Sequence, residues 1–200
     1  MCVQNPLTSI SDDVAATHRM INAQDGPVIL AGHSYGGAII TEAGNNPKVA
    51  GLVYVAAFAP DEGETLASLA EPYGATPLFG KLKPIEDGFL LLTPQGVKED
   101  FAQDLSTEEK ETMVATQAAT QGAILGTTIG KAAWHSKPSW FVIASNDRAI
   151  SPEQESKTAE RMGAKTLTLA TSHVAMLAKP QEVADFIIEA AASGAAQRAA

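Results

Sequence analysis

The chain has 200 residues and a mass of 20.8 kDa; 45% of its residues are hydrophobic and 18% are charged. This is the composition of a globular protein, and the length indicates one domain, or one domain with a lid. The net charge of −9 and the isoelectric point of about 4.8 argue against nucleic acid and anionic membranes as partners. Cys2 is the one cysteine, so an internal disulfide is excluded.

Neither a membrane span nor a signal peptide is predicted. The longest apolar run, Val49–Ala59, is much shorter than the roughly 20 residues that a spanning helix needs. The first basic residue is Arg19, and Asp12 and Asp13 fall where a signal peptide would be apolar. We therefore expect a cytoplasmic protein without a membrane partner.

The first 58 residues are predicted to alternate between helix and strand. Ser9 and Asp12 have the spacing of a helix-capping box, and Asp25-Gly26-Pro27 is a stop signal, which together bound a helix up to about residue 24. The following elements are an apolar strand at 27–33, a helix at 35–44 and an apolar strand at 49–58.

The same alternation returns after residue 138. Strands are expected at 139–145 and 165–169, and helices at 152–162 and 180–192. Regular alternation of this kind predicts an α/β fold with a parallel sheet and right-handed crossovers. We therefore assign residues 1–58 and 139–200 to one α/β core.

Residues 59–138 interrupt the alternation and contain several prolines. Two helices are expected there, at 95–104 and 107–121, the second opened by the capping box of Ser106 and Glu109. An insertion that follows the carboxyl end of a strand is well placed to shape a pocket. We therefore interpret 59–138 as a helical cap.

Gly32-His33-Ser34-Tyr35-Gly36 fits the pattern G-x-S-x-G between a predicted strand and a predicted helix. In that context the serine lies on a sharp, strained turn with its hydroxyl raised above the sheet. Gly32 and Gly36 are expected to prevent clashes at this turn, with Gly37 giving further room. We assign Ser34 as the nucleophile and the backbone N–H of Tyr35 as an oxyanion donor.

A nucleophilic serine needs a base, and the chain has four histidines. His173 follows the strand at 165–169, on the same rim as Ser34, and is the expected base. His18 lies on the first helix and His135 near the end of the insertion. His33 is expected to point away from the turn and to serve packing and hydrogen bonding.

The base in turn needs a carboxylate that fixes its tautomer. Asp147 follows the strand at 139–145 and is the expected partner, while Asp61, just after the strand at 49–58, is the alternative. The adjacent Arg148 is expected at the surface or in contact with the cap. Ser34, Asp147 and His173 follow the chain order that accompanies G-x-S-x-G in one class of hydrolases.

The segments GHSYGG, SNDRAISPE and SHVAMLAKPQEVADFI resemble the α/β-hydrolase superfamily, over nearly the whole chain. Within it, the chain is similar to the small esterases that include plant methyl-ester hydrolases and hydroxynitrile lyases. The resemblance implies that Ser34, Asp147 and His173 form a catalytic triad. The related lyases carry a lysine directly after the histidine; Val174 stands here instead and favours ester hydrolysis.

Members of this superfamily usually have several strands before the nucleophile. The residues before Ser34 are predicted to contain only the strand at 27–33. About four strands are expected, without the N-terminal half of the usual sheet, so the strand at 27–33 should be an edge. No His-Gly pair precedes Ser34 to supply a second oxyanion donor. We therefore expect either a truncated gene product or a chain that pairs with another, for example as a homo-oligomer.

The leading functional hypothesis is a serine hydrolase of small carboxylic esters. The alternatives are an inactive hydrolase-like module that binds an apolar ligand, and a lyase or perhydrolase that uses the same triad. The histidines and Cys2 lack metal-ligand spacing, and the glycine-rich turn lacks the lysine of a P-loop, so no metal or cofactor is expected. Trp134 is the candidate for lining the pocket.

Overall fold

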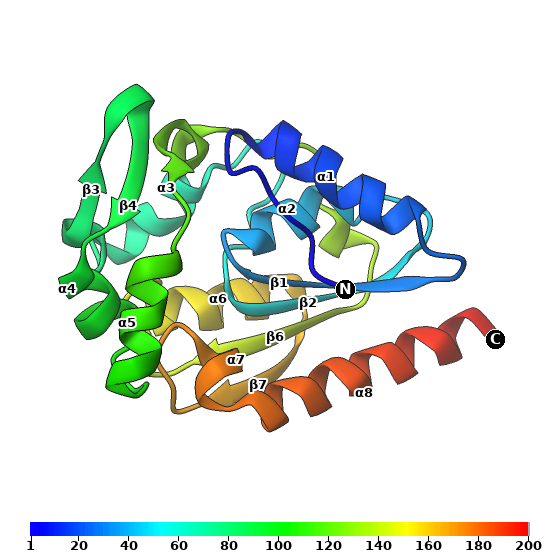
Figure 1. The fold of residues 1–200 in the computed structure, drawn as a ribbon. Helices are drawn as coiled ribbons and strands as arrows, with labels where there is room; N and C mark the ends of the chain where they lie inside the picture. Colours follow the sequence, from blue (N-terminus) through cyan, green and yellow to red (C-terminus); the bar gives the residue numbers. More distant parts are fainter. Residues whose placement is uncertain (200) are drawn as a thin grey trace.

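A computed structural model describes the backbone of residues 1–199 and the side chains of residues 1–193. In this part of the chain a parallel sheet is built in the order β1-β2-β6-β7, which confirms the predicted fold class (Figure 1). The strands agree with the predicted ranges to within a residue. They are β1 (Val28–Ser34), β2 (Val49–Ala57), β6 (Ser139–Ala144) and β7 (Lys165–Leu169).

Alternate residues of the central strands enter two separate hydrophobic clusters. Tyr54 and Phe141 stack in parallel with ring centroids 5.8 Å apart on one face of the sheet, while Val53 and Val142 enter the cluster on the other face. Since side chains alternate between the faces of a strand, this division follows from continuous apolar runs. A sheet that is apolar on both faces must be covered on both.

Helices cover the two faces as this pattern requires (Figure 1). The first cluster is closed by α1 (Ile10–Asn22), α2 (Gly36–Ala43) and α6 (Pro152–Met162), and the second by α7 (Ala175–Ala178) and α8 (Pro180–Ala199). Ser9 caps α1 by accepting the Asp12 N–H, as its spacing predicts. The last helix is longer than the predicted range of 180–192.

The insertion between β2 and β6 contains an antiparallel sheet, β3-β4-β5, that the sequence did not predict. The helix expected at 95–104 is a short turn followed by a π-helical turn. The helix expected at 107–121 begins at its Ser106–Glu109 capping box but ends at residue 116. The elements are α3 (Leu66–Ala70), β3 (Leu82–Pro84), β4 (Phe89–Leu92), α4 (Pro94–Gly96), the π-turn (Val97–Phe101), α5 (Thr107–Thr116) and β5 (Thr120–Gln121), joined by 3₁₀ turns.

The early end of α5 has a clear cause in Gln117. Its side-chain amide accepts the Leu92 N–H at 2.9 Å and donates to the Leu92 carbonyl at 3.1 Å, so it pairs with β4 like another strand residue. Its own backbone is extended, with φ −59° and ψ 141°. Figure 1 shows the segment with β3, β4, α4 and α5 beyond one end of the parallel sheet.

Strand β1 forms one edge of the parallel sheet, as expected for a chain with these strands. It pairs with β2 along its length, from Val28 opposite Val49 to Ser34 opposite Ala57. Of the helices that the structure describes, none combines the length and apolarity needed to cross a membrane.

The covered sheet makes a prediction about stability. Phe141 is fully buried between the sheet and its helical layer, so Phe141→Ala is expected to lower the free energy of unfolding by about 3–5 kcal/mol. Ile188 on α8 is 64% exposed, and Ile188→Ala should change it by no more than about 0.5 kcal/mol. Urea denaturation of both variants measures the difference; equal effects would contradict this description of the core.

Candidate active site

Ser34 ends β1 in a backbone conformation that side chains rarely adopt. Its φ is +54°, and α2 begins two residues later. A Cβ atom on Gly32 would lie 2.5 Å from the carbonyl oxygen of Gly36, so glycine is required there, as predicted. Positive φ at a non-glycine residue costs of order 1–3 kcal/mol and persists where surrounding structure enforces it.

The second glycine constraint lies one residue later than expected. A Cβ atom on Gly36 would meet no atom within 4 Å, whereas one on Gly37 would lie 2.3 Å from the carbonyl oxygen of Phe58. The expectation that Gly36 relieves a clash is therefore wrong. Gly37 is the residue that lets α2 approach the end of β2.

Asp147 and His173 are brought together by the ends of two neighbouring strands. Asp147 Oδ2 lies 2.5 Å from His173 Nδ1, and both side chains are fully inaccessible to solvent. The loops are joined by backbone bonds from Ser145 to Leu169 and from Asn146 to Thr171. Because a carboxylate only accepts, Nδ1 carries the proton in this contact.

The Asp147 carboxylate is further fixed by its own loop. Its Oδ1 accepts the backbone N–H groups of Ala149 at 2.6 Å and Ile150 at 3.1 Å. Burial alone would raise the pKa of Asp147, but His173 and the hydrogen bonds from Glu155 and the Ala149 N–H hold it below the ordinary value. Asp147 is therefore a buried carboxylate whose charge is compensated by hydrogen bonds.

The other ring nitrogen of His173 is available for chemistry. Nε2 is buried and has no hydrogen-bond partner among the described residues. His173 and Ser34 line the same cavity. With its proton on Nδ1, the neutral ring presents a lone pair at Nε2, which is the form that a general base requires.

His33 has the packing and hydrogen-bonding role predicted for it, but in a different place. It does not point away from the site: its ring centroid is 4.6 Å from that of His173, and it lines the cavity. Its Nε2 lies 2.9 Å from the His173 carbonyl oxygen, which can only accept, so His33 donates. Burial and the neighbouring His173 lower the pKa of His33 to about 3, so this ring is neutral near pH 7.

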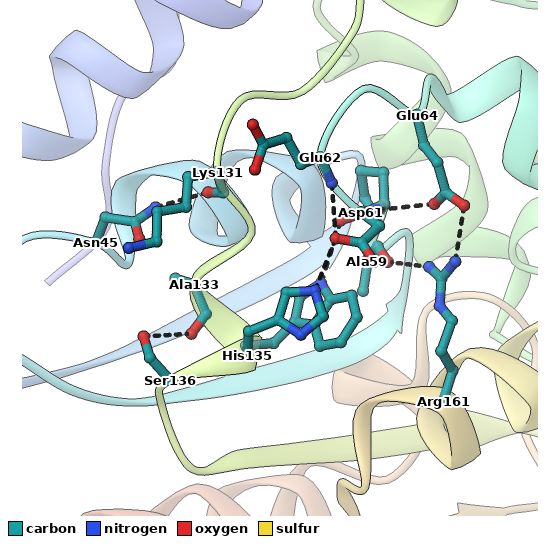
Figure 2. A network of polar contacts seen from close by, with 12 residues as sticks. Asn45, Ala59, Asp61, Glu62, Glu64, Lys131, Ala133, His135, Ser136 and Arg161 are labelled. Carbon is teal, nitrogen blue, oxygen red and sulfur yellow. Dashed lines mark hydrogen bonds and ion pairs between the residues drawn. The ribbon is translucent and has the colours of Figure 1, made fainter.

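The alternative carboxylate, Asp61, has another partner. Its Oδ1 lies 2.8 Å from Nε2 of His135, on the exposed polar network that also contains Glu64 and Arg161 (Figure 2). His18 is 3.4 Å from Asn46. Asp147, and not Asp61, is thus the carboxylate that the structure brings to His173.

Tyr35 lines the cavity next to Ser34 and is the residue directly before α2. Its hydroxyl donates to Asp13 Oδ2 at 2.7 Å, and burial raises the pKa of Tyr35, with the charge and hydrogen bond of Asp13 adding to the shift. Asp13 is fully buried in α1 and also accepts the Leu7 N–H. These bonds anchor the serine turn to the first helix, a role that the sequence did not indicate.

The cavity has a volume of about 630 Å³ and lies between the core and the insertion. Its walls are mostly aliphatic and aromatic, and its described lining contains no Lys, Arg, Asp or Glu. Polar atoms are supplied chiefly by the floor at Ser34 and His173 and by Gln117, Gln121 and Thr120.

Trp134, the expected lining residue, is absent from the cavity wall. Its ring is buried in the core, Nε1 donates to the Pro60 carbonyl at 3.1 Å, and the Arg161 guanidinium lies 5.4 Å from the ring centroid. The lining comes instead from elements of the insertion, among them Leu78, Leu90, Phe101 and Met113. Because the insertion's strands were not predicted, its cavity face was not either.

The insertion also holds the two loops of the site. Asp104 accepts the Ser172 N–H at 2.7 Å, and Gln103 donates to the Asn146 carbonyl at 2.7 Å. The Arg148 guanidinium pairs with buried Asp100 at 2.8 Å, which confirms the expected contact with the cap. The residues before and beside Asp147 and His173 are therefore bound to the same segment.

The site combines a strained serine, a histidine with a free nitrogen and a buried carboxylate at the carboxyl edge of a parallel sheet. This is the arrangement of proteins that carry out nucleophilic chemistry from a turn above an α/β sheet. Residues 5–186 match the model of the alpha/beta hydrolase family, and the chain belongs to that family.

Two curated relatives are similar in sequence. The carbendazim hydrolyzing esterase of Nocardioides sp. (strain SG-4G) is 50% identical over 44 residues, which cover 21% of this chain and 18% of the relative. The alpha/beta hydrolase nvfD of Aspergillus novofumigatus (strain IBT 16806) is 26% identical over 160 residues, covering 72% of this chain and 62% of the relative. The chain thus spans less than two thirds of either relative.

Solved structures share the fold at lower identity. A pyrethroid hydrolase from Sphingobium faniae JZ-2 superposes with a TM-score of 0.75 at 20% identity, covering 90% of this chain and 77% of the other. Polyneuridine aldehyde esterase gives a TM-score of 0.76 at 20% identity, covering 90% of this chain and 79% of the other. These likenesses establish the architecture in which Ser34, Asp147 and His173 are placed.

The two neighbouring glycines give a matched test of the serine turn. Gly37→Ala is expected to lower the free energy of unfolding by about 1–3 kcal/mol, because its methyl group would overlap the Phe58 carbonyl. Gly36→Ala should be neutral or stabilising by up to about 1 kcal/mol, because alanine favours a helix more than glycine does. Thermal unfolding of the two variants measures this difference. An equal loss of stability in both would contradict the geometry described for the serine turn.

Proposed function

We propose that the protein is a serine hydrolase that cleaves carboxylic esters through an acyl-enzyme intermediate. The observation that carries the proposal is the buried Asp147–His173 pair: His173 lines the same cavity as Ser34, and its Nε2 has no hydrogen-bond partner among the described residues. Family membership and relatives named as esterases or hydrolases support it.

The catalytic sequence uses Ser34 and His173 in turn. Ser34 Oγ attacks the ester carbonyl carbon while His173 Nε2 takes the hydroxyl proton, and Asp147 stabilises the imidazolium that forms. Collapse of the tetrahedral intermediate breaks the bond to the alcohol oxygen, which takes the proton from His173. Water, activated by the same nitrogen, then hydrolyses the acyl-enzyme and releases the acid.

The oxyanion of the intermediate falls at the start of α2. The backbone N–H of Tyr35 is assigned as a donor, since it follows the nucleophile at a helix N-terminus, where the helix dipole favours negative charge. Removal of one oxyanion donor typically costs about 100- to 1000-fold in rate, so this group carries much of the catalytic effect.

Two alternatives with the same fold, a lyase and a module that only binds ligand, are less favoured than an ester hydrolase. Val174 follows His173, is 3% exposed and packs against Ala102 and Leu105, so no cation stands beside the base at this position. A module that only binds an apolar ligand would need the cavity but not the Asp147–His173 pair, whose burial requires compensation.

Substitutions of the proposed triad test the reaction on an activated aryl ester. Ser34→Ala should lower kcat/KM by at least about 10³-fold, and Asp147→Asn by up to about 10⁴-fold through the wrong histidine tautomer. Asp61→Asn is the matched control and should leave the rate unchanged, because Asp61 pairs with His135 at the surface. Turnover that survives Ser34→Ala would refute the proposal, and ligand binding without turnover in the wild type would favour the binding module.

The cavity indicates neutral, largely apolar esters as substrates. A charged group placed against its aliphatic walls would lose hydration without gaining an ionic partner. The volume of about 630 Å³ lies in the usual range of small-molecule sites and accommodates substantial groups on the ester.

Two esters of similar length test this selectivity. A 4-nitrophenyl ester of pentanoic acid should have a kcat/KM at least about 10-fold above that of the glutaric monoester, which ends in a carboxylate. The ratio of the two rate constants should persist at high salt, where screening removes long-range repulsion by the acidic surface. Equal rates, or a preference that disappears in salt, would contradict selection by the apolar wall.

A further inference from the structure

A buried carboxyl group on α6 has no part in the mechanism above. Glu155 lies in the first turn of α6, and the residue is 0% exposed. One oxygen, Oε2, accepts the backbone N–H of Ala144 at 2.9 Å, at the end of β6. The other oxygen, Oε1, is buried and has no donor among the described residues.

Glu155 lies beside Asp147, because both residues bond to Ala144: Glu155 Oε2 accepts the Ala144 N–H at 2.9 Å, and the Asp147 N–H donates to the Ala144 carbonyl at 3.1 Å. A hydrogen bond between the two carboxyl groups is among the interactions that lower the pKa of Asp147 and raise the pKa of Glu155. Two carboxyl groups in contact and out of solvent cannot both carry a charge, so one of them holds a proton. Asp147 is the charged member, because His173 Nδ1 and the backbone N–H groups of Ala149 and Ile150 donate to it.

We propose that Glu155 is a positioning residue of the site: it remains protonated and donates its carboxyl O–H to Asp147. This rests on the function proposed above, in which Asp147 orients His173. The extra donor restricts the rotation of the Asp147 carboxylate and withdraws part of its negative charge. Asp147 then holds His173 in one tautomer without binding the imidazolium so tightly that the base loses its reactivity at neutral pH.

The surroundings of Glu155 agree with a neutral carboxylic acid. Burial and then the charge of Asp147 raise the pKa of Glu155 well above its ordinary value. The other titratable groups beyond Asp147 are His173 and His33, whose tilted ring lies with its centroid 4.6 Å from that of His173. A protonated Glu155 satisfies both contacts at once, since one oxygen accepts from Ala144 and the other donates to Asp147.

Glutamine is the matched substitution because it reproduces this pattern without a titrating proton. Its carbonyl oxygen can accept from Ala144 and its amide can donate to Asp147. Glu155→Gln should therefore retain kcat/KM within about threefold. Glu155→Leu should lower it by roughly 10- to 100-fold, the loss measured in metal sites when a group that orients a ligand is removed. Gln154→Leu, at a position 2% exposed on the same helix, controls for the loss of a buried polar side chain.

The pH profile of kcat/KM separates positioning from general damage. In Glu155→Leu, Asp147 no longer accepts a hydrogen bond from Glu155 and keeps its full negative charge. It should then stabilise the His173 imidazolium more strongly, so the acid limb of the profile moves to higher pH. The limb should stay in place in Glu155→Gln and Gln154→Leu. An unmoved limb in Glu155→Leu, or a Glu155→Gln variant as impaired as Glu155→Leu, would overturn the proposal.

Thermal unfolding tests the proton on Glu155 without any turnover. An unfolded Glu ionises near 4.5, so above that pH the wild type must release a proton on unfolding and loses stability as pH rises towards the higher folded pKa. Glutamine has no such proton. The Tm of Glu155→Gln minus that of the wild type should increase between about pH 5 and pH 7, and a constant difference would overturn the assignment.

A Ser34→Ala control assayed in parallel keeps the two proposals apart. Its undiminished activity would reject the serine mechanism while the Tm comparison still reports on Glu155. The other informative outcome is an inactive Ser34→Ala together with Glu155 variants that match Gln154→Leu in kcat/KM, in the acid limb of the pH profile and in the pH dependence of Tm. In that case the serine mechanism stands and the role of Glu155 is refuted.

Discussion

The buried negative charge of Asp147 is the constraint around which the rest of the site is arranged. An uncompensated carboxylate without solvent access would be strongly destabilising, so donors must surround it. They come from its own loop, at Ala149 and Ile150, and from His173 on the neighbouring loop. The requirement of folding and the requirement of the proposed chemistry are thus met by the same hydrogen bonds: compensating Asp147 also fixes the proton on His173 Nδ1 and leaves Nε2 free.

These loops are held from outside as well as from the sheet. The insertion contributes Asp104 and Gln103 to their backbones and Asp100 to Arg148, so the segment that forms the cavity wall also fixes the groups on its floor. The insertion, which forms the cavity wall, and the loops that carry Asp147 and His173 are therefore joined by hydrogen bonds and an ion pair. We expect a substitution that moves the insertion to move these loops as well, because the hydrogen bonds and the ion pair that connect them are 2.7–2.8 Å long.

The sequence predicted the features that depend on local pattern and strand order. Ser34 was predicted because it stands between two glycines where an apolar run meets a helix. His173 and Asp147 were predicted because each follows a parallel strand, and such strands end at the same edge of the sheet. Trp134 was misplaced because contacts with Pro60 and Arg161, distant in sequence, fix its ring. The strands of the insertion are only two to four residues long and carry too little periodicity. Glu155 did leave a signal: on α6 it shares a face with the buried Ala159 and Met162, a spacing that indicates a buried acid.

The apolar cavity and the polar floor act on each other through the local dielectric. The described walls carry no Lys, Arg, Asp or Glu, and electrostatic interactions beside an apolar wall are stronger than in bulk water. In the proposed mechanism, the walls that favour a neutral ester also increase the effect of the Tyr35 N–H on an oxyanion and of Asp147 on an imidazolium. His33 fits this arrangement: its ring contacts that of His173, but its lowered pKa keeps it uncharged. It therefore bonds to the His173 backbone without opposing the positive charge that the proposed mechanism places on that ring. In the proposed function, selectivity and catalysis therefore have one structural basis: the described cavity lining carries no Lys, Arg, Asp or Glu, and the charge of Asp147 beneath it is compensated by hydrogen bonds.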